Sequence, residues 1–408
     1  MYFNRKLIIF IVICSIISGQ NYLNRAIGNR VNPIAAKSSS MGGVGFMNNK
    51  TASVSIINPA YLMNQTGFTF DINYSNLYIG ESRNFPAIDF FEDYYADLTY
   101  VVNAQSYSAY NIGISYVSGA LGISASTGPF ISTDYNFVEE VRNNDDELEG
   151  YFQFETTGDI ICNSYGLGLS INKSLHLGFS LNQLLNTTFK SHQNDNQDII
   201  DIASSLTSNT EFVTLSMWVL PVNDIELAVG YENSAIIKYT SLLDITMDET
   251  IGLPQYDTSN VVVLNELYKP TYTRVGFEYK PSQINTHTLT VEYEKAEYSN
   301  FEIDSTKLRD VHTLGVGIEY RIYNFVPLRV GLTHRSSPFR SDLSRTMFSL
   351  GTGWDFKHFN VDIGGRYWNS AYPYADIFPV EGDNSNPSGV DFVKENNIEI
   401  SLSLQYKI

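Results

Sequence analysis

The sequence has little charge and almost no cysteine. Asp, Glu, Lys and Arg make up 17% of its 408 residues, whereas soluble domains average about 25%. Acidic residues (44) outnumber basic residues (26), which gives a net charge of −18. Such a surface would repel phosphate, so nucleic acid is excluded as a partner. The two cysteines are Cys14, in the amino-terminal apolar run, and Cys162, so the sequence predicts a fold without an internal disulfide.

Long apolar runs are also missing. Mean hydropathy is −0.14, and beyond the amino terminus no run reaches the ~18 residues of a membrane-spanning helix. Near the amino terminus, Arg5 and Lys6 precede an apolar run over residues 7–17, which is followed by small and polar residues. That run is too short to cross a bilayer core of about 30 Å, so we predict a secretory signal peptide over residues 1–19.

The dominant pattern of residues 66–408 is alternation of apolar and polar side chains. The last segment shows it without an error, because Ile398, Ile400, Leu402 and every second residue after them are apolar while their neighbours are polar. Alternation with period two indicates a strand with two different faces. These runs extend to about ten or twelve residues, the length that a tilted strand needs to cross a bilayer.

About fourteen such runs follow one another, and their connections alternate between short and long. They centre near residues 72, 112, 123, 166, 178, 215, 228, 275, 291, 316, 330, 350, 363 and 402. We expect long polar loops over 80–105, 128–158, 190–209, 238–269, 300–309, 336–344 and 371–395. An even strand count with short turns at one end and long loops at the other is typical of outer-membrane barrels. The predicted fold class is therefore all-β, a transmembrane antiparallel β-barrel of about 14 strands over residues 66–408, in the outer membrane of a Gram-negative-type bacterium.

The charged residues of the predicted strands fall on the polar face. Facing lipid, each would cost up to a few kcal/mol near the bilayer midplane, so we expect them to point into a wet or plugged lumen. The residues concerned are Glu226, Glu232, Arg274, Glu278, Glu292, Glu319, Arg321, Arg329, Asp355, Asp362, Arg366 and Glu399.

Residues 20–65, which precede the first strand, do not alternate. They contain a glycine-rich stretch from Ser38 to Gly45, with Met41, Gly42 and Gly43, and about ten residues later a second stretch from Ser55 to Leu62, with Asn58, Pro59 and Ala60. Their apolar content favours a plug in the lumen over a tail in water. This pattern resembles the FadL-type long-chain fatty acid transporters and the related PorV/PorQ-type outer-membrane proteins, in which it marks an amino-terminal hatch inside a fourteen-stranded barrel.

The resemblance implies a channel for passive uptake of hydrophobic small molecules, such as long-chain fatty acids or hydrocarbons. We expect Phe46, Met47, Ile56 and Ile57 to line a ligand pocket, although packing of the plug alone would also explain these residues. In FadL-type barrels a kinked third strand opens a lateral gate. Here the third run, residues 120–127, ends at Gly128-Pro129, where proline cannot join a strand ladder, although this dipeptide is also a normal start for a loop.

The expected partners follow from the same resemblance. They are hydrophobic small molecules, outer-membrane lipid and lipopolysaccharide, and the barrel insertion machinery, which recognises the last strand. That strand ends in Ile408 instead of the usual aromatic residue. The alternative function is that of the PorV-type branch, an outer-membrane component of a protein secretion system with secretion-system proteins as partners.

Motifs for catalysis are missing, so we expect no enzyme, no cofactor and no metal. The six histidines are dispersed without a zinc-binding pair, and each Gly-x-Ser lacks the second glycine of a nucleophile elbow. His334-Arg335-Ser336-Ser337, at the outer end of a strand, has no paired acid and is a weak candidate for a hydrolase site. Cys162 is expected to be a small packed residue.

Overall fold

A computed structural model describes residues 29–31, 35–88, 94–142, 145, 147–185, 188–194, 198–247, 261–281, 286–303, 306–323, 326–378 and 390–408. The predicted signal peptide, residues 1–19, lies outside the described residues, as do residues 20–28 and 32–34 of the predicted hatch.

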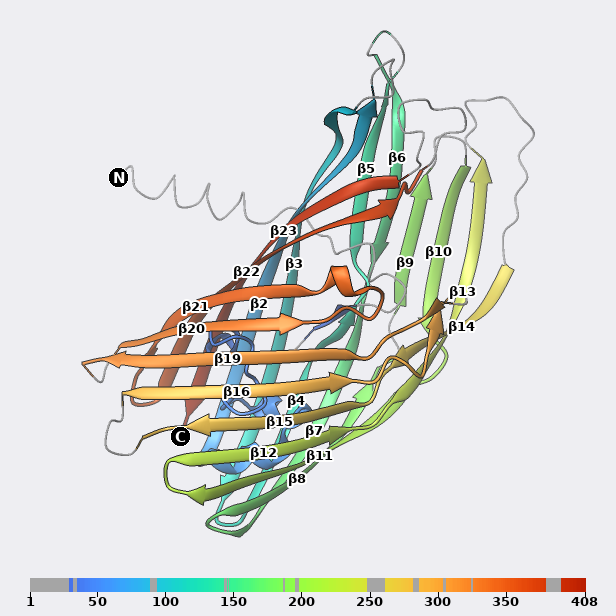
Figure 1. Ribbon diagram of the computed structural model, residues 1–408. Coiled ribbons are helices and arrows are strands. Elements are labelled where there is room, and N and C mark those ends of the chain that lie inside the picture. Colours follow the sequence, from blue (N-terminus) through green and yellow to red (C-terminus); the bar gives the residue numbers. More distant parts are fainter. Residues whose placement is uncertain are drawn as a thin grey trace, which may run out of the picture.

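Fourteen antiparallel strands close into a barrel, which confirms the predicted fold class (Figure 1). The circle closes because β2 pairs with β23 and β4 pairs with β7. Every one of the fourteen predicted centres falls inside one of these strands. They are β2 (Gly67–Ile88), β3 (Tyr94–Ser118), β4 (Leu121–Ser132), β7 (Asp159–Asn172), β8 (Leu175–Leu184), β11 (Thr210–Val222), β12 (Ile225–Glu232), β15 (Tyr272–Tyr279), β16 (His287–Ala296), β19 (Val311–Ile322), β20 (Val326–Arg335), β21 (Arg345–Asp355), β22 (Phe359–Ala375) and β23 (Val390–Lys407).

The alternation read from the sequence corresponds to two chemically different faces. Along β23 the apolar residues from Ile398 to Leu404 keep 42–50% of their surface exposed, whereas Ser401, Ser403 and Gln405 keep only 3–6%. Large apolar side chains are exposed on the outside because lipid, not water, is the expected solvent there. On the lumen side Glu232, Glu278 and Arg329 are buried, as expected for charged residues of the polar face.

The predicted long loops were wrong in most places, because much of their length is strand. Loops 128–158, 190–209 and 238–269 contain the strands of a second, six-stranded sheet. The tall strands β2 and β3 fill much of 80–105, and a two-stranded hairpin falls within 300–309. The six strands are β5 (Tyr135–Arg142), β6 (Leu148–Thr157), β9 (Thr188–Asn194), β10 (Asp198–Leu206), β13 (Ala235–Met247) and β14 (Val261–Lys269), and the hairpin is β17 (Glu302–Ile303) with β18 (Thr306–Lys307).

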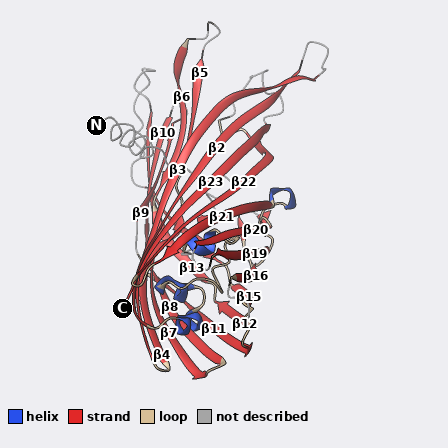
Figure 2. Ribbon diagram, turned by 90° about the vertical axis from the view of Figure 1, so that its left-hand side faces the viewer, coloured by secondary structure: helices blue, strands red, loops and turns tan. Residues whose placement is uncertain are grey.

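The six-stranded sheet extends the barrel wall. Each of its strands is joined to a barrel strand across a short break, as at Thr133-Asp134 between β4 and β5 or at Gly158 between β6 and β7. Figures 1 and 2 show this extension rising beside the tall strands β2 and β3. The sequences of the extension strands, such as VVVLNELYK in β14, lack the strict alternation that would have predicted them.

The lower lumen is filled by the segment that precedes the first barrel strand (Figure 2). It consists of β1 (Asn29–Arg30), which pairs with β4, followed by α2 (Ala36–Ser39), η2 (Ala52–Ile56) and η3 (Pro59–Asn64). Most of residues 35–62 are buried. We call residues 35–65 the hatch segment. A further short helix, η5 (Ser341–Leu343), lies between β20 and β21. Of the helices described, none is long and apolar enough to cross a bilayer.

Candidate functional site

The hatch segment is held by polar side chains of the barrel wall. Short helices and turns leave many backbone groups without an internal partner, and buried backbone groups must be paired. The Glu292 carboxylate of β16 accepts hydrogen bonds from the backbone N–H groups of Phe46 (3.1 Å) and Met47 (2.6 Å). Asp71 of β2 accepts one from Ala52 N–H at 2.7 Å. The polar lumen face therefore serves as the socket of the hatch segment.

The two stretches of the sequence pattern lie close together inside this socket, at Asn58. Its side-chain amide donates to the carbonyl oxygen of Phe46 at 2.6 Å, so it ties the residue that follows the glycine-rich stretch to the Asn-Pro-Ala stretch. Pro59 begins η3, where its missing N–H costs nothing, and Ala60 N–H donates to Ser216 of β11 at 2.8 Å. All three residues have a structural role in the hatch segment.

Met41, Gly42 and Gly43 form the turn at the top of the hatch segment. Gly42 and Gly43 have φ of 77° and 66°, a left-handed conformation that glycine adopts without strain. Gly42 N–H donates to Ser349 at 2.7 Å, and its carbonyl oxygen accepts from Thr333. Met41 packs against Gly317 of β19, where a methyl group would lie 2.6 Å from the Met41 Cβ. Glycine in the lumen-facing wall thus makes room for the hatch segment.

The four predicted ligand residues are all buried, but they do not converge on one pocket. Phe46 and Met47 pack in one apolar cluster with Tyr61 and Trp218. Ile56 and Ile57 belong to another, which lies against the upper barrel wall. Its other members are Phe130, Ile131, Ile160, Cys162, Leu184, Leu206, Phe212, Ile237 and Leu267. Their contact with a ligand stays a prediction.

Phe46 and Ile57 share a small cavity of about 70 Å³ beside the Gly42–Gly43 turn. Its other walls include the charged side chains of Arg274, Glu292 and Glu294. This volume suits a few water molecules and is well below the ~300 Å³ at which small-molecule pockets begin.

A larger cavity of about 230 Å³ lies above the hatch segment, and Gly43 belongs to both cavities. On one side its wall includes Tyr107 and Ala109 of β3 and Ser132 of β4. On the opposite side it includes Arg335 of β20 and Arg345 of β21. We call this space the outer cavity. It joins the floor made by the hatch turn to two different parts of the barrel wall.

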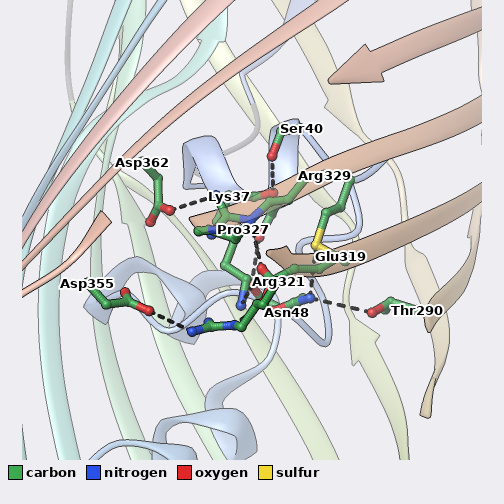
Figure 3. Close-up of polar contacts among 12 residues, drawn as sticks. Lys37, Ser40, Asn48, Thr290, Glu319, Arg321, Pro327, Arg329, Asp355 and Asp362 are labelled. Atoms are coloured by element: carbon green, nitrogen blue, oxygen red, sulfur yellow. Dashed lines mark hydrogen bonds and ion pairs between the residues drawn. The ribbon is translucent and has the colours of Figure 1, made fainter. Parts of the chain in front are cut away.

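Two carboxylates of the lumen each collect several cations, and Arg30 of the first cluster also lines the outer cavity. Glu232, whose side chain is fully buried, lies 2.8–3.0 Å from Arg30, Lys269 and Arg274. Glu319 lies 3.5 Å from Lys37 of the hatch segment, 3.0 Å from Arg321 and 2.7 Å from Arg329. Figure 3 shows this second cluster, in which Arg329 also reaches Asp362 and Arg321 reaches Asp355. Both clusters bind an amino-terminal cation to the wall. Burial by itself lowers the pKa of Arg30, but the interactions with Glu232, Tyr272 and Glu294 outweigh it, so the pKa of Arg30 is raised.

The predicted lateral gate falls where β3 and β4 stop pairing. Their ladder runs from Ser118–Leu121 to Ile112–Thr127 and ends there. Gly128 still lies against the backbone of Tyr110, but from Pro129 onward β4 pairs with β7 and β1 and no longer with β3. The register with β7 shifts between Pro129 and Ile131. Opening at this seam stays a prediction.

Sequence reasoning missed the cationic wall of the outer cavity. The sequence indicates Arg335 only as part of the His334-Arg335-Ser336-Ser337 motif, and no pattern in it singles out Arg345 or Trp368. In the structure His334 is exposed and its side chain is hydrogen-bonded to that of Thr346, whereas Arg335 lines the cavity. The available signal was the strand period, because Arg335 lies two residues from the lumen-facing Thr333. Within the described part of the chain, no group of His, Cys, Asp or Glu is placed to hold a metal ion.

The comparisons with known proteins concern the fold. No protein-family model and no curated protein matches the sequence. Among solved structures, the chain is similar to a FadL homologue of Pseudomonas aeruginosa, with a TM-score of 0.68 and 14% identity, covering 93% of this chain and 99% of that one. It is similar to the toluene transporter TodX of Pseudomonas putida, with a TM-score of 0.61 and 10% identity, covering 93% of this chain and 99% of that one. It is also similar to the monoaromatic hydrocarbon channel CymD, with a TM-score of 0.61 and 13% identity, covering 92% of this chain and 97% of that one.

These likenesses confirm, at the level of the fold, the FadL-type resemblance that the sequence pattern indicated. They give no support to the alternative of a PorV-type secretion component.

Proposed function

We propose that the chain is an outer-membrane channel for passive uptake of hydrophobic small molecules, with no chemistry of its own. The observation that carries this proposal is the outer cavity, which lies directly above the hatch segment and has Tyr107, Ala109 and Ser132 in its wall at the seam between β3 and β4. A cavity at an unpaired seam offers a solute a lateral way out. The structural neighbours include a toluene transporter and a FadL homologue, which supports this class of solute.

The physical reason for a lateral exit is the chemistry of the lumen. The lower lumen is packed with the hatch segment (Figure 2), and the lumen holds charged clusters such as that of Glu319 with Lys37, Arg321 and Arg329. An apolar molecule gains free energy by entering lipid and would lose it by passing those charges. At the seam, Pro129 has no N–H to donate, and the pairing of β3 with β4 ends at Ile112. We propose that hydrocarbons or fatty acids leave for the membrane here.

A substitution at the seam tests the proposal. Ala109→Trp places a large side chain in the outer cavity beside the seam, and we expect uptake of toluene by cells that carry the chain to fall by roughly an order of magnitude. The matched control is Ala104→Trp on the same strand, where the side chain is exposed. Both variants should show the same heat modifiability on a gel as the parent.

Two results would contradict the proposal. Equal toluene uptake by cells with and without the protein would contradict the proposed transport function. Full uptake by cells carrying Ala109→Trp would be compatible with transport but would contradict an exit at the seam.

A further inference from the structure

The lipid-facing side of the barrel wall ends in a polar rim at the end that carries the six-stranded sheet. On six strands, the position two residues beyond the last exposed apolar side chain holds a neutral polar residue: Asn163, Gln183, Thr273, Thr346, Asn369 and Asn396. Three neighbouring strands differ. The same position holds Lys295 on β16, His312 on β19 and His334 on β20. The rim therefore has one sector of basic residue types.

The three side chains of this sector are neighbours. β16, β19 and β20 lie side by side in the sheet (Figure 1), and Lys295 is directly opposite His312 in the antiparallel register. His334 is directly opposite Leu314, the next lipid-facing residue after His312. Side chains at opposite and diagonal positions on one face of a sheet lie within reach of each other. We call Lys295, His312 and His334 the rim cluster.

Each imidazole of the rim cluster uses one ring nitrogen within the protein. His312 Nδ1 is hydrogen-bonded to the Tyr293 hydroxyl at 2.7 Å, and His334 Nδ1 to the Thr346 hydroxyl at 2.9 Å. When the hydroxyl donates, the proton of the neutral ring lies on Nε2. Both histidines are exposed, and within the described residues neither Nε2 makes a hydrogen bond. A donor at the edge of the hydrocarbon needs an acceptor from its surroundings.

Two carboxylates lie next to the rim cluster on its water side. Glu297 follows Lys295 by two residues and Asp310 precedes His312 by two residues, and they lie 3.1 Å and 3.0 Å from the Lys295 ammonium. One ammonium therefore balances two carboxylates only in part. The exposed Arg309, next to Asp310, interacts with Asp342 of a neighbouring loop. A ligand with a net negative charge would be repelled here, whereas one that brings its own ammonium would complete the balance.

The order of chemical groups along the wall is that of a zwitterionic lipid. From the hydrocarbon outward, β19 and the residues before it present the exposed Leu314, then His312, then Asp310. Successive lipid-facing positions are about 7 Å apart along a strand. A phosphoethanolamine lipid has its acyl chains, its phosphate and its ammonium in the same order. Phosphate oxygens accept hydrogen bonds from N–H groups, and the ammonium suits the carboxylates.

We propose that the rim cluster binds the phosphoethanolamine head group of a membrane lipid. The Nε2–H groups of His312 and His334 donate to the phosphate, and the lipid ammonium lies against Glu297 and Asp310. The acyl chains cover the exposed apolar side chains Leu314, Leu332 and Phe348. This site goes beyond the proposed function, because it is on the lipid side of the wall and the outer cavity is on the lumen side. Its test does not depend on transport.

Equilibrium binding to the purified full chain in a neutral detergent tests the proposal. The main probe is dioctanoylphosphatidylethanolamine. Dioctanoylphosphatidylglycerol lacks the ammonium, dioctanoylglycerol also lacks the phosphate, and free phosphoethanolamine lacks the tails. We expect the main probe to bind most tightly. H312F/H334F should weaken its binding about tenfold or more, in line with the loss of two hydrogen bonds to a charged group. Phenylalanine keeps an aromatic ring at the rim, so a merely interfacial role of the histidines would be preserved.

The matched control is H287F/H358F, which changes two exposed histidines at the opposite end of the barrel wall. It should bind the main probe like the parent. A second variant, E297Q/D310N, tests the ammonium separately. It should weaken binding of dioctanoylphosphatidylethanolamine and leave that of dioctanoylphosphatidylglycerol equal or tighter, so that the preference between the two lipids disappears. All variants should keep the heat modifiability of the parent. If H312F/H334F fails to fold, E297Q/D310N decides.

Several results would overturn the proposal. Unchanged binding of the main probe in H312F/H334F, or an equal loss in H287F/H358F, would exclude the two rim histidines as phosphate donors. An unchanged lipid preference in E297Q/D310N would exclude the two carboxylates as the ammonium site. Binding of dioctanoylglycerol as tight as that of the main probe would indicate contact with the tails alone. Equally tight binding of free phosphoethanolamine would indicate a site for a soluble head group and not for a lipid.

Discussion

The barrel lumen holds its cations in two contrasting ways. In the Glu232 and Glu319 clusters, three cations converge on one carboxylate, and each cluster includes a cation from the segment that precedes the first barrel strand. In the outer cavity, Arg335 and Arg345 face each other, and among the described residues no carboxylate lies within ion-pair distance of either. Both arrangements lie in the same polar lumen, so polarity alone does not explain the difference. The ion pairs of the two clusters join residues that precede the first barrel strand to the wall, whereas the two arginines of the outer cavity form no ion pair among the described residues.

The largest effect should come from breaking a neutralised cluster. Glu232→Gln removes the charge at which Arg30, Lys269 and Arg274 meet and leaves buried cations without a counter-ion. Removal of one partner from a buried ionic group typically costs about 3–5 kcal/mol. We expect a large decrease in the temperature at which the unboiled barrel loses its compact migration on a gel.

The control for this prediction is Glu140→Gln, because Glu140 pairs with Arg142 on the surface and is 51% exposed. Exposed pairs contribute about 0–1 kcal/mol, so this variant should behave like the parent. Equal decreases in the two variants would contradict the contrast between buried and exposed ion pairs.

A smaller effect is expected from pushing the hatch segment away from the wall. Gly317→Val adds a side chain where Met41 of the hatch segment already lies, with a Cβ-to-Cβ distance of 2.6 Å. Overpacking costs about 1–3 kcal/mol, and we expect the hatch segment to shift and the barrel to leak small hydrophilic solutes in a liposome-swelling assay. Gly80→Val is the control, since no atom lies within 4 Å of an added Cβ there. A tight barrel in Gly317→Val would show that the hatch segment repacks without moving.

The link between the two stretches of the hatch segment should contribute less. Asn58→Ala removes the donor to the Phe46 carbonyl oxygen, and an unpaired buried acceptor costs about 1–2 kcal/mol. We expect a modest decrease in unfolding temperature and faster protease cleavage within residues 41–60. Asn369→Ala, at an exposed position, should change neither. No change in protease sensitivity in Asn58→Ala would contradict a role for this bond in holding the segment.

The smallest effect concerns Lys50, a cation of the hatch segment that no carboxylate of the described residues pairs with. Burial, together with the charges of Lys37, Lys280 and Lys407, lowers the pKa of Lys50 from 10.5 to about 8. Between pH 8 and 10.5 the unfolded chain therefore binds more protons at this site than the folded one, so stability should rise with pH across this window. Lys50→Gln should remove that rise, as measured by unfolding temperature from pH 7 to 10.5. An identical pH slope in the parent and the variant would assign the effect to other groups.

The sequence predicted the membrane-spanning part of the fold closely, and the reason is the two-sided strand. A strand such as β23 must alternate because Ile400 faces lipid while Ser401 and Ser403 face the lumen. Outside the membrane this constraint ends. Strands such as β9 and β10 were therefore expected to be loop.

The candidate site was less accessible to sequence reasoning. The pattern around Asn58 indicated a plug, and residues 35–64 do lie in the lumen. Periodicity could place Arg335 and Arg345 on a lumen face, but it could not show that they are opposite each other, since this depends on the register and on the length of the β20–β21 hairpin. The partners of Glu232 come from residues as distant in sequence as Arg30 and Arg274.

By itself, the sequence determined the class of fold, the strand count and which side of each strand meets lipid, because these follow from a period of two residues that every membrane-spanning strand must keep. Only the tertiary structure decided which lumen charges neutralise each other and which remain unpaired. Charges interact through space, and closure of the barrel brings together side chains from strands and from the hatch segment whose distance along the chain says nothing about their distance in the lumen.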